Sequence, residues 1–108
     1  MLMPPPDYDH PPVIPVIEHV LPWEEIQRRC NIVFGTQQVR RGCSLRWPDR
    51  CEIWLSQVGF VPKPVGINRD LRITEKVQAA VRRHEIAHCN GWPSDHPGAI
   101  NKHVDGEW

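Results

Sequence analysis

The sequence predicts a small α+β domain, and three stretches of the chain carry this prediction. Residues 74–90 show the apolar periodicity of an amphipathic helix. Residues 13–21 are rich in β-branched side chains, which favour a strand, and residues 43–55 contain two further short strand patterns. A chain of 108 residues is long enough for one domain with one hydrophobic core. We therefore expect a single domain over residues 13–108, preceded by a proline-rich lead-in over residues 1–12.

Proline determines how the first part of the chain is interpreted. Prolines cluster in the lead-in, which is predicted to be extended or disordered. Pro15 cannot donate a hydrogen bond to a neighbouring strand, so the first strand is expected at a sheet edge or beginning after this proline. His19 is expected on the surface of that strand. Pro22 then opens a short helix, with an acidic pair at residues 24–25 near its positive end and an arginine pair at residues 28–29 near its negative end.

The middle of the chain predicts a β-hairpin between two loops. Residues 31–42 leave two interpretations open, an extension of the short helix or the start of a strand, followed by a polar loop. Apolar residues alternate over 43–47 and again over 51–55, which indicates two strands joined by a turn. The edge of such a hairpin can pair with an extended peptide, and a purely structural hairpin is an equally good interpretation. Glycines and prolines over 56–70 predict a loop.

The long helix carries the strongest functional signal in the chain, the sequence His84-Glu85-Ile86-Ala87-His88. Asp70 or Thr74 is suited to cap the start of this helix. At about 100° per residue, the two histidines lie about 40° apart around the helix axis and continue its apolar stripe. Two imidazoles placed in this way can share one zinc ion, and the carboxylate of Glu85 lies at the edge of the same face. The alternative interpretation is two buried, hydrogen-bonded histidines on an ordinary amphipathic helix.

A third metal ligand has to come from outside the helix. Gly91 is placed to end the helix in a left-handed conformation, and the prolines that follow predict a tight turn that returns His96 toward the metal. We prefer His96 as the third ligand because imidazole is a favoured zinc ligand. Asp95 is the second candidate, either as a ligand or as a hydrogen-bond partner of one. Glu107 and His103 are weaker candidates.

The stretch from His84 to Gly91 has the pattern H-E-x-x-H-x-x-G and resembles the zincin class of zinc metallopeptidases, with the metzincin branch nearest. The resemblance implies a zincin-like domain whose active-site helix carries the motif, one zinc ion per chain, and a peptide or protein substrate. His84 and His88 would be metal ligands. Glu85 would be the general base that takes a proton from the attacking water, and Gly91 would be the turn.

Two features depart from the metzincin pattern. Ser94 holds the place of the third histidine, and His96 comes two residues later. No methionine follows residue 3, so the methionine turn of that branch is missing. The motif therefore predicts a minimal zincin with peptidase activity. A non-catalytic zinc-stabilised binding domain and a zinc hydrolase of a non-peptide amide are the alternatives, and an oxyanion stabiliser is not identifiable beyond weak candidates in Tyr8 and His103.

The composition of the chain indicates which partners and which cellular compartment to expect. The net charge is zero with neutral histidines, which argues against a nucleic-acid partner, and no apolar run approaches membrane-spanning length. Four cysteines in a short chain favour disulfides and a secreted or periplasmic protein, although buried reduced thiols are the alternative. We expect Cys43 and Cys51 either in different bridges or in one bridge across the hairpin. Residues 1–12 lack the pattern of a signal peptide, which leaves a cytosolic protein or a mature form without its leader.

Overall fold

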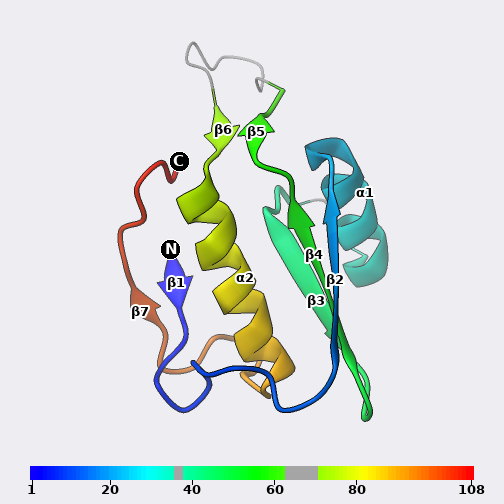
Figure 1. Ribbon diagram of the computed structural model, residues 1–108, viewed down its shortest axis with the longest axis vertical. Helices are drawn as coiled ribbons and strands as arrows, with labels where there is room; N and C mark the ends of the chain where they lie inside the picture. The colour runs from blue at the N-terminus through cyan, green and yellow to red at the C-terminus, as the bar shows by residue number, and fades with distance from the viewer. Residues whose placement is uncertain (36–37, 63–70) are drawn as a thin grey trace.

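The computed structural model describes residues 1–35, 38–62 and 71–108, and these residues form an α+β structure with two helices and several small sheets (Figure 1). The predicted α+β class is therefore confirmed. The elements in chain order are β1 (Leu2–Met3), β2 (Val16–Leu21), α1 (Trp23–Phe34), β3 (Gly42–Arg46), β4 (Cys51–Ser56), β5 (Gly59–Phe60), β6 (Arg72–Ile73), α2 (Glu75–Cys89) and β7 (Ile100–Asn101).

The central sheet has three strands in the order β2-β4-β3. The predicted hairpin is confirmed, because β3 and β4 pair antiparallel with Cys43 opposite Trp54. Strand β2 pairs with β4 in parallel and lies at the sheet edge. It begins at Val16, directly after the proline that was predicted to limit it. Strand β4 is thus the central strand, and its last four residues are buried.

The two helices cover opposite faces of this sheet (Figure 1). Alternate residues of β4 explain the arrangement, because Ile53 packs in the core with α2 and Trp54 packs in the core with α1. The α1 core also contains Ile26 and Cys30, one turn apart on the inner face of that helix. Residues 31–34 extend α1, which settles the two interpretations of this segment, and Gly35 ends the helix with a φ of 62°.

Two disulfides connect the layers. One joins Cys30 of α1 to Cys43 of β3, and the other joins Cys51 of β4 to Cys89 at the end of α2. Cys43 and Cys51 therefore belong to different bridges, which is one of the two arrangements left open by the sequence. Both bridges fit an oxidising compartment.

The proline-rich N-terminal segment lies along α2 and the C-terminal segment. Strand β1 pairs antiparallel with β7 (Figure 1), and a turn follows in which the backbone N–H of Tyr8 donates to the carbonyl of Pro5 at 3.1 Å. Asp9 forms an ion pair with Arg83 of α2. The side-chain amide of Asn90 donates hydrogen bonds to the backbone carbonyls of Tyr8 and His10, at 3.0 and 2.8 Å. These contacts attach the segment to the helix that carries the motif.

Helix α2 begins where one of the two predicted caps is placed. Thr74 accepts a hydrogen bond from the backbone N–H of Val77 at 3.1 Å, whereas Asp70 lies outside the described residues. The stretch predicted as a loop over 56–70 contains β5, which pairs with β6, and its residues 63–70 also lie outside the described residues. Among the described helices, neither is long and apolar enough to cross a membrane.

Candidate metal site

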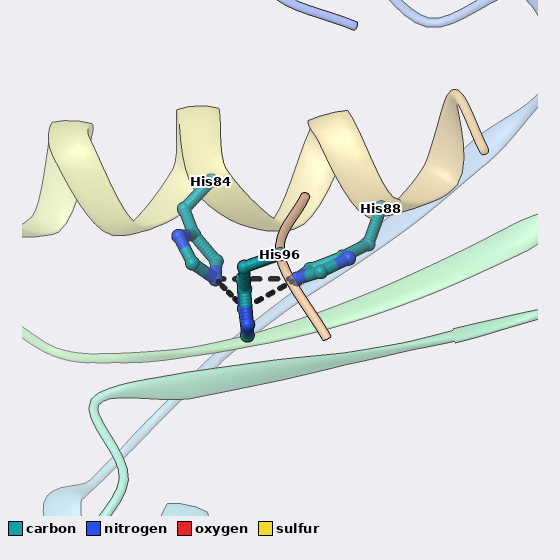
Figure 2. Close-up of side chains that lie close together, drawn as sticks. All are labelled: His84, His88 and His96. Atoms are coloured by element: carbon teal, nitrogen blue, oxygen red, sulfur yellow. Dashed lines mark hydrogen bonds between the residues drawn. The ribbon is translucent and has the colours of Figure 1, made fainter. Parts of the chain in front are cut away.

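Three imidazole rings meet below α2 and form an equilateral triangle of nitrogen atoms (Figure 2). The Nε2 atoms of His84, His88 and His96 are each 3.2 Å from the other two. His84 and His88 project from successive turns of α2, and His96 approaches from the segment that follows the helix (Figure 2). In the described part of the chain, this is the one group of three or more histidine, cysteine or acidic side chains that could hold a metal ion.

The turn after α2 places the third histidine. Gly91 has a φ of 101°, so the chain leaves the helix through the positive-φ conformation predicted for this glycine. His96 has a φ of 57°, a left-handed conformation that side chains rarely adopt, and its N–H donates to the carbonyl of Pro93 at 3.0 Å. The buried Trp92 stacks on the ring of His88. Its indole N–H donates to the carbonyl of Pro97 at 2.9 Å, which fixes the turn from inside.

Backbone carbonyls orient two of the three rings. The Nδ1 atom of His84 lies 2.7 Å from the carbonyl oxygen of Leu2, and the Nδ1 atom of His88 lies 2.7 Å from that of Trp92. A carbonyl oxygen accepts hydrogen bonds only, so each Nδ1 carries the proton and each Nε2 directs its lone pair at the centre of the triangle. This pattern, with a second group holding the far nitrogen of a ligand, is typical of histidines that bind metals.

The geometry and the protonation of the cluster both fit a tetrahedral metal ion. Zinc–nitrogen bonds of about 2.05 Å at tetrahedral angles place the ligand nitrogens about 3.3 Å apart, and the observed separation is 3.2 Å. Burial lowers the pKa of His84 to about 4 and also lowers the pKa of His88. Both rings are therefore neutral at pH 7, which is the form that binds a metal. A bound cation would also relieve the repulsion between lone pairs that point at one another.

Glu85 lies between α2 and the edge strand β3. Its side chain is buried, with 7% of the residue exposed, and burial raises its pKa to about 7. The nearby Ser44 side chain acts in the opposite direction on this pKa. Glu85 and His84 line both a cavity of about 360 Å³ and a groove of about 540 Å³.

The register of β3 beside α2 determines which helix residue lies next to each strand residue. A side chain at Gly42 would meet Val81, and Ser44 meets Glu85. Arg46 then donates from Nε to the carbonyl of Cys89 at 3.0 Å. Residues 42–46 of a strand advance about 13 Å and residues 81–89 of a helix advance about 12 Å, so the two elements keep this register over their common length.

The other candidates from the sequence lie away from the triangle. Asp95 is exposed and does not belong to the cluster. Glu107 forms an ion pair at 2.9 Å with the amino group of Met1, and His103 lies on the surface, 3.5 Å from a carboxylate oxygen of Asp105. Neither His103 nor Tyr8 lines the cavity or the groove at Glu85.

Three functional contacts had no local signal in the sequence. They are the Leu2 carbonyl on His84, the Ser44 hydroxyl on Glu85 and the Arg46 guanidinium in the groove. Each joins residues that are far apart in the chain, so only the packing of β1 and β3 against α2 reveals them.

Comparison with protein-family models, with curated protein sequences and with solved structures gives no match.

Proposed function

We propose that this protein is a zinc-dependent metallopeptidase, in which His84, His88 and His96 hold one zinc ion and Glu85 is the general base. The observation that supports this most is the convergence of three Nε2 atoms beside a buried carboxylate that directly follows one of the ligands. The two disulfides support a secreted or periplasmic location for the enzyme.

Held by His84, His88 and His96 with one position open, a zinc ion would supply Lewis-acid chemistry, which polarises a carbonyl group and lowers the pKa of water toward about 7. The chain itself supplies the proton transfers. Glu85 accepts a proton from the attacking water and delivers it to the leaving amine. Burial raises the pKa of Glu85 to about 7, so its carboxyl group is able to take up and release a proton near neutral pH.

The open edge of β3 supports a peptide as the substrate. The N–H of Trp47 donates to the carbonyl of Arg50 at 2.8 Å, so these residues form a hydrogen-bonded pair of the hairpin. Such pairs alternate with non-bonded pairs along an antiparallel ladder. The backbone groups of Gly42, Ser44 and Arg46 therefore point to the open edge, where β3 has no neighbour among the described strands. An extended peptide that pairs there meets Ser44, which is level with Glu85.

The two alternative functions fit the site less well. A non-catalytic zinc site is normally closed by a fourth protein ligand, and the cluster in the described residues has three members. A hydrolase of small non-peptide amides has no use for an open strand edge beside its base. Peptide hydrolysis accounts for both observations.

The variant Glu85→Gln tests this proposal. It keeps the size and shape of the side chain and removes the base, so we expect zinc content and the melting temperature to stay close to those of the unmodified protein. Cleavage of a peptide library should fall by about 10²–10⁴-fold, the usual contribution of a general base. Asp95→Ala is the matched control, because it removes an exposed carboxylate that directly precedes His96 in the chain and lies outside the cluster. Undiminished cleavage by zinc-loaded Glu85→Gln protein would refute the mechanism.

A further inference from the structure

The groove beside the candidate metal site is lined by more positively charged than negatively charged side chains. It runs along β3 past the triangle of histidines and encloses about 540 Å³. Arg40 and Arg46 line it, and Glu85 is the one carboxylate among the described residues of its lining. Asp95, in the turn nearby, is exposed and is not part of that lining. Because low-dielectric walls focus the field of such a cleft, the groove attracts negative charge, and a bound metal cation strengthens this effect.

Arg46 is the residue that presents this charge in a fixed position. It is the last residue of β3, and its Nε donates to the carbonyl of Cys89, which directly follows the ligand His88. A guanidinium has five N–H donors, so this bond leaves four for another partner. Other arginines of the chain already have a carboxylate partner, namely Arg28, Arg50, Arg82 and Arg83. Among the described residues, no carboxylate is within ion-pair distance of Arg46.

The open edge of β3 determines which part of a substrate would reach Arg46. Ser44 and Arg46 both direct their backbone groups outward and their side chains toward α2. A peptide paired with this edge therefore places one residue opposite each of them, about 5.5 Å away between Cα atoms and with its side chain on the same face. The residue opposite Ser44 is level with Glu85, so the residue opposite Arg46 is two positions away along the peptide.

We propose that Arg46 is a specificity-determining residue that selects peptides with an acidic side chain two positions from the residue that pairs with Ser44. A carboxylate there would accept paired hydrogen bonds from the guanidinium, whereas a lysine would meet like charge. The inference rests on the proposed peptidase function and adds a substrate class to it, an extended acidic peptide.

The test separates binding from cleavage. Zinc-loaded Glu85→Gln protein is titrated with fluorescent, acetylated and amidated peptides in which one Glu, Gln or Lys is moved through an otherwise neutral sequence. Fluorescence anisotropy should show one position where Glu binds about fivefold tighter than Gln and Lys binds more weakly, the size expected of one good cross-strand charge pair. The preference should decrease as salt is added, because the groove is open to solvent.

Variants of Arg46 identify the cause of the preference. Arg46→Gln should remove it, Arg46→Lys should retain it and Arg46→Glu should reverse it, each with its zinc content measured in parallel. Arg50→Gln is the matched control, since Arg50 lies at the turn of the same hairpin, pairs with Asp49 and does not line the groove. Equal affinity for Glu and Gln at every position, or a preference that persists in Arg46→Gln, would overturn the inference.

Two further measurements test the selectivity of Arg46 separately from the proposed peptidase activity. A neutral peptide with a free C-terminal carboxylate tests the other source of negative charge, and tighter binding of this peptide alone would contradict recognition of a side chain. Cleavage is then measured with Glu85 intact. Acidic peptides that bind through Arg46 without being cleaved would refute the peptidase and leave the selectivity standing. Equal cleavage of acidic and neutral peptides would do the reverse.

Discussion

His96 shows how single residues hold this site together. Its left-handed backbone costs about 1 kcal/mol for a residue with a side chain, and it persists because Trp92 and the Pro93 carbonyl fix the turn. This backbone conformation places the Nε2 atom of His96 3.2 Å from the Nε2 atoms of His84 and His88. A bound metal ion would offset this strain, so metal binding explains why His96 has a left-handed backbone.

Variants of the adjacent residues Asp95 and His96 test whether His96 is a metal ligand. His96→Ala removes one of three ligands, so we expect zinc affinity to fall by more than the 10–100-fold that is typical for the loss of a group supporting a ligand. Asp95→Ala should leave zinc affinity unchanged, because the Asp95 carboxylate lies outside the cluster. Competition with a chromogenic chelator measures both affinities. Loss of zinc from Asp95→Ala but not from His96→Ala would reverse the ligand assignment.

Residues near one another in the chain could be anticipated, and residues that meet through packing could not. His84 and His88 are one helical turn apart, so periodicity alone placed them on the same face. The position of His96 required only a turn signal within a few residues of the helix end. In contrast, the contact of Ser44 with Glu85 depends on the register of β3 beside α2, which no local pattern contains.

At the scale of elements, the end of α2 is fixed by β3 and β4. Arg46 of β3 donates a hydrogen bond to the carbonyl of the last residue of the helix, and a disulfide joins Cys51 of β4 to Cys89, which directly follows the proposed ligand His88. The hairpin itself was predictable from its alternating apolar residues, whereas the pairing of the cysteines was not, since four cysteines allow three pairings. The short strands β5 and β6 were also missed, because two-residue strands have no periodicity to detect.

The two disulfides make a matched pair for measuring how these elements are held. Their sequence separations are 13 residues for Cys30–Cys43 and 38 residues for Cys51–Cys89. Loop-closure entropy predicts a loss of about 3 kcal/mol in the free energy of unfolding when the first is removed and about 4 kcal/mol when the second is removed. Urea unfolding of the two double Cys→Ala variants measures both losses. A larger loss for Cys30–Cys43 would show that loop length does not govern their contributions.

At the scale of the whole molecule, both ends of the chain support the motif helix. Strand β1 pairs with β7, and the carbonyl of Leu2 in β1 orients His84, one of the three proposed ligands. Composition gave no sign that the N-terminal segment would contact the site, because the strands involved are only two residues long. The zincin-like arrangement of the domain remains a prediction that rests on the motif and on the cluster of histidines.

X-ray absorption spectroscopy at the zinc edge tests the central claim most directly. Protein purified without chelator should contain about one zinc per chain. The ion should have three histidine nitrogens at about 2.0–2.1 Å and one light atom from solvent, as in open catalytic zinc sites. The His88→Ala variant should lose this signal. Absence of zinc, a sulfur ligand, or four protein ligands would contradict the account of this protein as a metallopeptidase.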